Sequence, residues 1–259
     1  METMLKVTNL SKNFGGVKAV NDLSLTVNKG EICAIIGPNG SGKTTSINLI
    51  TGVLTPDSGD IQYNGYSINN MSRHERAKHG ITRTFQNLRI FSTLSILDHV
   101  MVGCYPRSDS SFLSCTFLSR AARAEEKANR AKSFDLLRLV GLEGKEHLAA
   151  KSLSYGQRRQ LEIARALATE PKLLFLDEPA AGMSSSEINN LIDLIFQIRE
   201  MGVTVVFIEH RMPVVMTAAD KIAVLNYGSC IAQGTADEIQ ANPLVIEAYL
   251  GTAYKRELA

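Results

Sequence analysis

The sequence predicts a three-layer α/β fold in which a helical segment is inserted between the early and the late strands. A short apolar run at 31–36 leads into a glycine-rich loop at 37–45, and a helix-like run at 45–50 follows that loop. Apolar runs of strand length return at 171–176 and 203–208, and a mainly helical pattern separates them from the loop. These observations together indicate buried strands that alternate with helices.

The loop is Gly-Pro-Asn-Gly-Ser-Gly-Lys-Thr-Thr, and it fits the pattern G-x-x-x-x-G-K-[ST]. Glycines let backbone N–H groups approach phosphate oxygens, and the helix start adds unpaired N–H groups. Lys43 would bridge the β- and γ-phosphates, and the Thr44 hydroxyl would ligate Mg²⁺. A chance glycine turn is disfavoured because a strand and a helix flank the loop. We therefore predict a nucleoside triphosphate site formed by Gly37, Pro38, Asn39, Gly40, Ser41, Gly42, Lys43, Thr44 and Thr45.

Composition narrows the class of protein. The 259 residues are 44% hydrophobic, which suffices for a core in one large domain or in one domain with an inserted lobe. The net charge of +2 does not suggest a nucleic-acid partner or a polybasic membrane anchor. No apolar stretch approaches the about 20 residues that span a bilayer, and we expect no signal peptide. Any membrane association would then run through a partner.

The four cysteines show no metal-ligand spacing. Cys33 and Cys230 fall in apolar, strand-like runs, where a buried and inert thiol is expected. This usage fits a reducing cytoplasm.

Short elements are predicted on both sides of the glycine loop. Residues 4–36 alternate with a period of two between turn signals, which predicts antiparallel strands. Phe14 precedes a double glycine and could stack on a purine base or lie in the core; its own segment favours the core. Residues 60–65 predict a strand that ends in an Asn–Gly turn, and 72–75 predict a helix start with a capping box. Residues 81–86 predict a strand with a glutamine at its exit.

The inserted segment is predicted to be helical over 95–167. Apolar residues near helical spacing at 121–142, opposite charged ones, predict an amphipathic helix. Residues 104–119, rich in Ser, Phe and Leu, could be a partner-facing loop or an ordinary connection. We therefore expect residues 1–94 and 168–259 to form the nucleotide-binding core.

A second acidic position is predicted directly after a buried strand. The run Leu-Leu-Phe-Leu ends in Asp177, which the strand would deliver beside Thr44 and its Mg²⁺. Glu178 is then placed to act as the general base for an attacking water. A solvated pair of surface acids is the alternative. The buried strand before the pair and Pro179 after it disfavour that alternative.

The run Leu-Ser-Tyr-Gly-Gln at 153–157 resembles the signature L-S-G-G-Q of the ATP-binding subunits of ABC transporters. The resemblance implies an ABC ATPase core of the P-loop NTPase type, with an N-terminal antiparallel β-subdomain and an inserted helical subdomain. As a helix start, the run also favours a phosphate. In the family, this motif contacts ATP that is bound to the opposite subunit. The residues so implied are Leu153, Ser154, Tyr155, Gly156 and Gln157.

The same resemblance implies roles for residues elsewhere. Phe14 resembles the aromatic that stacks on adenine, which reverses the expectation from its own segment. Gln86 resembles the glutamine that reaches Mg²⁺ and senses the membrane partner, and His210 resembles the switch histidine at the γ-phosphate. Tyr155 replaces a glycine, so its side chain must point away from the nucleotide.

The sequence departs from the family at two positions. Ser184 stands where the loop after Pro179 usually ends in aspartate. Arg211 follows the switch histidine, where an acidic residue is often found. Both departures concern contacts across the dimer, and neither removes a phosphate or metal ligand.

The resemblance covers essentially the whole chain and is nearest to the ATP-binding subunits of bacterial branched-chain amino-acid importers. It depends on residues 81–91, 153–168, 177–183, 208–210 and 245–251. It implies ATP and Mg²⁺ as cofactors and a peripheral location at the cytoplasmic face of the inner membrane. The implied partners are a paralogous ATP-binding subunit, two membrane-spanning permeases and, indirectly, a periplasmic or lipid-anchored solute-binding protein. A heterodimer is expected in the cell, and a homodimer could form in isolation.

Three alternatives remain. A related ABC subunit for urea, amide or other amino-acid import, or for lipopolysaccharide export, would share every catalytic residue. A soluble ABC ATPase of DNA repair or chromosome maintenance would need a coiled-coil insert or tandem cassettes, and the chain also lacks a basic patch. The run at 154–157 argues against a P-loop kinase outside the ABC family.

Overall fold

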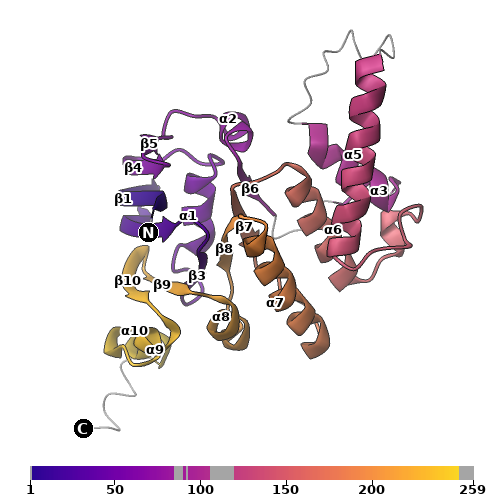
Figure 1. Cartoon of the computed structure of the whole chain (residues 1–259). Coiled ribbons are helices and arrows are strands. Elements are labelled where there is room, and N and C mark those ends of the chain that lie inside the picture. The colour runs from indigo at the N-terminus through magenta and orange to yellow at the C-terminus, as the bar shows by residue number, and fades with distance from the viewer. Residues whose placement is uncertain (1, 85–89, 92, 106–119, 251–259) are drawn as a thin grey trace.

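Figure 1 shows the computed structural model of the chain, which describes residues 2–84, 90–91, 93–105 and 120–250. Its strands are β1 (Thr3–Phe14), β2 (Val17–Asn28), β3 (Ile32–Ile36), β4 (Ser58–Tyr63), β5 (Tyr66–Ser67), β6 (Ile81–Arg83), β7 (Leu173–Asp177), β8 (Thr204–Ile208), β9 (Lys221–Asn226) and β10 (Ser229–Gly234). Its helices are α1 (Lys43–Ile50), α2 (Arg73–Lys78), α3 (Ile96–Cys104), α5 (Arg120–Leu139), the 3-10 turn η2 (Ala150–Ser152), α6 (Tyr155–Ala168), α7 (Ser185–Glu200), α8 (Met212–Ala218), α9 (Ala236–Gln240) and α10 (Pro243–Leu250).

The N-terminal strands β1 and β2 form an antiparallel sheet with β4 and β5, in the order β2-β1-β4-β5. The prediction of antiparallel strands over residues 4–36 is therefore confirmed for β1 and β2, but it is wrong for β3, which pairs in parallel with β8 and β9. Strand β1 is longer than its apolar runs suggest, because bulges interrupt the alternation. One bulge falls between Val7 and Leu10, where Asn9 has a φ of 50°. The predicted Asn–Gly turn joins β4 to β5, with φ values of 49° at Asn64 and 81° at Gly65.

The larger sheet has the order β10-β9-β3-β8-β7-β6, and all neighbouring pairs are parallel except β9 with β10. Asp177 is in register with Ile208, and Ile208 is in register with Ile35. Strands β3, β7 and β8 therefore end at one edge of the sheet, and the loops that follow them meet there. Residues at that edge are placed to form a binding site.

Successive side chains of β3 face different layers of the molecule. Cys33 and Ile35 pack with residues of the antiparallel sheet and α1. Ile32, Ala34 and Ile36 pack on the other face, with residues of α6, α7 and α8. The larger sheet is thus the middle one of three layers, as the sequence predicts.

Helices α3, α5 and α6 pack against one another on the side of the sheet away from β1 and β4 (Figure 1). Helices α3 and α6 approach closely at Gly103, where a Cβ would collide with the carbonyl oxygen of Arg165. The predicted helix at 121–142 is α5, and the division of the core at 95 and 168 stays a prediction. Most of the 104–119 segment lies outside the described residues.

Cys33, Cys104 and Cys230 are free thiols; Cys33 is buried, as predicted, whereas Cys230 is only partly buried. Burial raises the pKa of Cys33 to about 12, so this thiol in β3 is inert at neutral pH. Burial also raises the pKa of Cys230 in β10. None of the helices in the part of the chain that the structure describes has the length and apolar character of a bilayer span.

A buried arginine fixes the end of α1, the helix that follows the glycine loop. The Arg76 side chain is only 1% exposed, and its guanidinium donates to the carbonyls of Leu49 and Ile50 at 2.7 Å each. It also donates to the carbonyl of Ile68 at 2.8 Å. Helix α2, which carries this arginine, begins at the predicted capping box of Ser72. Arg76 therefore satisfies carbonyls that end α1 without intrahelical partners.

Replacing Arg76 by leucine is expected to lower the free energy of unfolding by about 2–4 kcal/mol, because several carbonyls lose their donor inside the protein. Lys78→Ala, at an exposed position of the same helix, is the matched control and should change stability by less than about 0.5 kcal/mol. Denaturant unfolding of both variants measures the difference. Equal stability of the two would show that Arg76 does not hold the end of α1.

Candidate functional site

The glycine loop lies between β3 and α1, and backbone of neighbouring strands packs closely against it. A Cβ on Gly37 would meet the carbonyl oxygen of Leu225, and a Cβ on Gly42 would meet that of Ala19. Gly42 also has a φ of 97°, which L side chains rarely adopt. Glycines are therefore required at both positions. Of the backbone N–H groups between them, that of Ser41 donates to the carbonyl of Pro38 at 3.2 Å.

Lys43 reaches back across this loop. Its Nζ atom donates to the carbonyls of Gly37 at 2.7 Å and Pro38 at 2.9 Å. Burial lowers the pKa of Lys43, and the nearby Glu178 carboxylate acts against that shift. Thr44 is exposed in the first turn of α1. The ammonium and the hydroxyl that the sequence assigns to phosphate and metal thus lie on the same loop.

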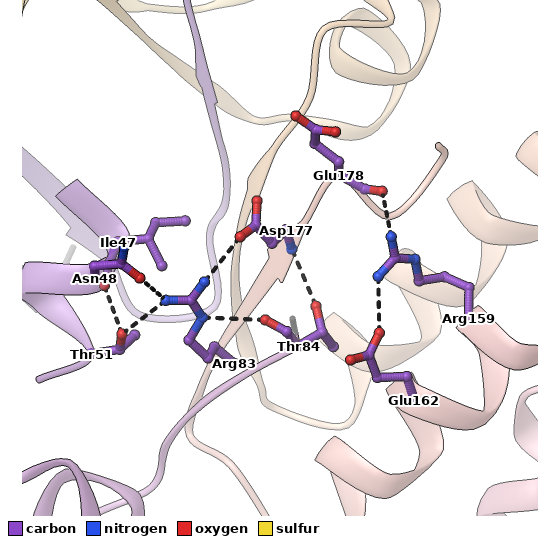
Figure 2. Close-up of polar contacts among 9 residues, drawn as sticks. All are labelled: Ile47, Asn48, Thr51, Arg83, Thr84, Arg159, Glu162, Asp177 and Glu178. Carbon is purple, nitrogen blue, oxygen red and sulfur yellow. Dashed lines mark hydrogen bonds and ion pairs between the residues drawn. The ribbon is translucent and has the colours of Figure 1, made fainter. Parts of the chain in front are cut away.

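Asp177 ends β7 and is 1% exposed. Its Oδ2 atom accepts from the guanidinium of Arg83 at 3.0 Å, and the same guanidinium contacts Asn48 of α1 and Thr51, which directly follows that helix (Figure 2). Burial raises the pKa of Asp177, and the charge of Arg83 opposes this shift. Arg83 therefore connects Asp177, at the end of β7, to α1, the helix that follows the glycine loop.

The second oxygen of Asp177 fits a divalent cation. Within the described ranges, Oδ1 of Asp177 is buried and has no hydrogen-bond partner. A buried acceptor without a donor is costly, and a carboxylate oxygen is the kind of ligand that Mg²⁺ prefers. In the described part of the chain, Asp177 makes no hydrogen bond with Thr44, and Gln86 lies outside the described residues. The assignment of these three residues to Mg²⁺ stays a prediction.

Glu178 and His210 lie beside Asp177 at the same sheet edge. An Oε1 atom of Glu178 is 3.9 Å from Nδ1 of His210, and their side chains are 24% and 58% exposed. The backbone of Glu178 has a φ of 47°, and its N–H donates to the carbonyl of Ile208 at 3.0 Å. A carboxylate and an imidazole thus meet at an edge that solvent can reach, as the predicted roles of base and switch require.

The signature run starts α6 as predicted. The Ser154 hydroxyl accepts from the N–H of Gln157 at 3.3 Å, and the side-chain oxygen of Gln157 accepts from the N–H of Ser154 at 3.1 Å. The ring of Tyr155 packs against Gly182, where an added Cβ would lie 2.9 Å from a ring carbon. The ring is therefore directed toward its own chain's loop after Pro179, and the neighbouring Gly156 is buried beside the carboxylate of Glu187.

Phe14 ends β1 with 48% of its surface exposed. The core role that its own segment favoured is therefore wrong. The Nζ atom of Lys12 lies 5.9 Å from the ring centroid. An exposed aromatic is available for stacking on a base, and this role stays a prediction.

Two buried ionic groups beside the site were not predicted from the sequence. Arg159 and Glu162 lie one turn apart on α6, each 1% exposed, and pair at 2.9 Å. Arg159 also donates to the backbone carbonyl of Glu178 at 3.4 Å (Figure 2). The signature helix is thus connected to the backbone of the predicted base. A charged pair at helical spacing gives no sign in the sequence that it is buried.

The departures from the family pattern have local structural roles. Ser184 caps α7 through a capping box with Glu187. The guanidinium of Arg211 donates to the carbonyl of Met183 at 3.0 Å. Both residues therefore stabilise the loop between Pro179 and α7 within the chain.

Residues 20–181 match the family described as ABC transporter. The chain belongs to this family. Residues 229–255 match a second family, described as branched-chain amino acid ATP-binding cassette transporter. The predicted family and the predicted ABC ATPase fold are confirmed, and the chain is an ATP-binding, ATP-hydrolysing cassette.

Named relatives of this ABC cassette cover nearly its whole length. BraF of Pseudomonas aeruginosa, a high-affinity branched-chain amino acid transport ATP-binding protein, is 41% identical over 251 residues, which are 96% of this chain and 98% of BraF. LivG of Escherichia coli, with the same description, is 36% identical over 253 residues, which are 97% of this chain and 99% of LivG.

Solved structures of ABC cassettes have the same fold. A nucleotide-free ATP-binding cassette from an ABC transporter matches with a TM-score of 0.83 and 34% identity, over 95% of this chain and 98% of the other. An ATP-binding cassette in its ADP conformation matches with a TM-score of 0.84 and 34% identity, over 97% of this chain and 100% of the other.

Proposed function

We propose that the chain is the ATP-hydrolysing subunit of an importer for branched-chain amino acids. The observation that carries the catalytic part is the convergence of Asp177, Glu178 and His210 at one sheet edge, next to the strand that leads into the glycine loop. The cargo is supported by the match of residues 229–255 and by the descriptions of BraF and LivG.

The loop binds the triphosphate through its backbone N–H groups and through Lys43. Thr44, Asp177 and Gln86 would hold Mg²⁺, which supplies charge neutralisation at the phosphates when it is bound. Glu178 takes a proton from the attacking water, and His210 orients the reacting groups at the γ-phosphate. Phe14 contributes stacking on the adenine.

A second chain completes each site. Ser154 and Gly156 of one chain serve the γ-phosphate that the other chain holds, because the start of a helix carries the positive end of its dipole. In the cell the second chain is a paralogous ATP-binding subunit, so the functional unit is a heterodimer. A periplasmic or lipid-anchored solute-binding protein delivers the cargo to the permeases.

The permeases dock into a cleft between α2, β6 and the helical segment, which holds the chain at the cytoplasmic face of the membrane. This cleft has a volume of about 320 Å³. Its walls combine the basic side chains of Arg73, Arg83 and Arg165 with the exposed apolar side chains of Phe91 and Val102. Arg83 lines this cleft and pairs with Asp177, so it would transmit the movement of a permease element to that carboxylate.

Uptake of labelled leucine tests the cargo. Cells that carry this chain with its partner subunits are compared with cells that carry only Glu178→Gln. Loss of uptake in the variant supports an ATP-driven branched-chain amino-acid importer. Unchanged uptake, with the variant present in membranes and its ATPase activity lost, would assign another cargo or export to the system and leave the enzyme assignment intact.

Ser154→Ala tests the sharing of sites between chains. The variant should lower turnover by roughly tenfold or more, because a hydrogen bond to a charged phosphate is lost. Loss of the cap of α6 should also cost about 0.5–2 kcal/mol of stability. A mixture of Ser154→Ala and Glu178→Gln chains should regain activity, because mixed dimers contain one intact site. If the mixture is no more active than its components, copies of this chain do not share sites in this way.

A further inference from the structure

Glu209 is a buried carboxylate for which the proposed mechanism has no role. It follows β8 and directly precedes His210, and it is 0% exposed. A buried carboxylate is costly unless donors surround it. Its surroundings therefore indicate what it does.

The two oxygens of Glu209 accept hydrogen bonds from two different loops. Oε1 accepts from the backbone N–H of Ala180 at 2.8 Å. Oε2 accepts from the backbone N–H groups of His210 at 3.1 Å and Arg211 at 3.2 Å. One carboxylate thus joins the loop that begins at Glu178 to the loop that carries His210.

Two other hydrogen bonds between these loops lie on either side of Ala180 along the chain. The N–H of Glu178 donates to the carbonyl of Ile208 at 3.0 Å, which continues the pairing of β7 with β8. Beyond Ala180, the half-exposed Arg211 side chain donates to the carbonyl of Met183 at 3.0 Å. The side chains of Glu178 and His210 also approach to 3.9 Å, but solvent can reach both. Among the described residues, the charge-assisted hydrogen bonds of Glu209 connect the two loops inside the protein.

We propose that Glu209 is a positioning residue for ATP hydrolysis, which fixes the loop of the base Glu178 against the loop of the switch histidine His210. This inference rests on the proposed roles of those two residues. Because both act on one reacting centre, a shift of about 1 Å between their loops would cost about 10²-fold in rate.

Glu209→Gln is designed to remove the hydrogen bond between Glu209 and Ala180 without changing the size of the side chain. An amide has one acceptor oxygen, and the pair of N–H groups of His210 and Arg211 would hold it. The NH₂ group then faces the N–H of Ala180. Both groups are hydrogen-bond donors, so no hydrogen bond forms between them. Glu209→Asp also removes the connection between the loops. It keeps the negative charge, but its side chain is one methylene too short to accept from both loops.

ATPase kinetics and ATP binding of the full-length chain are measured in Mg²⁺ for each variant. Both variants are expected to lose about 10²-fold in kcat, while the Kd for ATP stays within about twofold of the wild-type value. The control is Glu238→Gln in the remote helix α9, where an exposed carboxylate accepts from the backbone N–H of the N-cap residue Thr235. This control should keep wild-type kcat.

The double variant Glu178→Gln with Glu209→Gln separates positioning from a general loss of structure. If Glu209 acts through the base, the double variant is no slower than Glu178→Gln alone. Wild-type kcat in a folded Glu209→Gln or Glu209→Asp, or losses that multiply in the double variant, would overturn the inference. Wild-type turnover of Glu178→Gln itself would instead overturn the proposed role of the base.

Discussion

Glu178→Gln is expected to lower ATP turnover by about 10²–10⁴-fold, because glutamine cannot take a proton from the attacking water. ATP binding should be retained. The side chain keeps its shape, and the loop, Lys43 and Asp177 are unchanged. Steady-state ATPase assays and nucleotide binding by the same preparation measure the two effects.

Glu143→Gln is a suitable control for the base, because Glu143 is exposed and pairs with an exposed arginine, Arg138, at 3.3 Å. It should hydrolyse ATP at the wild-type rate. A Glu178→Gln variant that also hydrolyses ATP at that rate would show that another group acts as the base.

Lys43→Ala is expected to weaken ATP binding by about 10- to 100-fold, because a hydrogen bond between two charged groups is lost. The free energy of unfolding should fall by about 1–2 kcal/mol, because the amine gives up two hydrogen bonds to carbonyls of its own loop, one of them that of the buried Gly37. Titration of the full-length chain with ATP measures the affinity, and thermal unfolding without nucleotide measures stability.

Lys78→Ala is the control for the loss of a positive charge, since Lys78 is exposed on α2. It should bind ATP with wild-type affinity. If Lys43→Ala also binds with wild-type affinity, the triphosphate does not depend on this lysine, and its assignment to the phosphates is wrong.

Features that depend on consecutive residues could be predicted from the sequence. The glycine loop, the helix start at Ser154 and the Asn–Gly turn after β4 each specify their geometry within a few positions. Asp177 could be placed because four apolar residues before it predict a buried strand. These predictions depend on local backbone preferences and on the period of apolar residues.

Features that depend on partners far along the chain could not be predicted. Glu209 accepts from Ala180, and Arg83 pairs with Asp177 over 94 positions. Nothing near these residues shows that they are buried, because the donors and acceptors that balance their charges come from other elements. The length of β1 could not be predicted for a different reason: its bulges shift the alternation on which strand prediction depends.

Glu178 has a strained backbone conformation at a position that the reaction requires. A φ of 47° is strained for any residue with a Cβ, by about 1–2 kcal/mol. The N–H and carbonyl of Glu178 are nevertheless held there, by Ile208 and Arg159. A glycine would adopt this conformation without strain and would give a more stable protein that cannot hydrolyse ATP. At position 178, stability and turnover favour different amino acids.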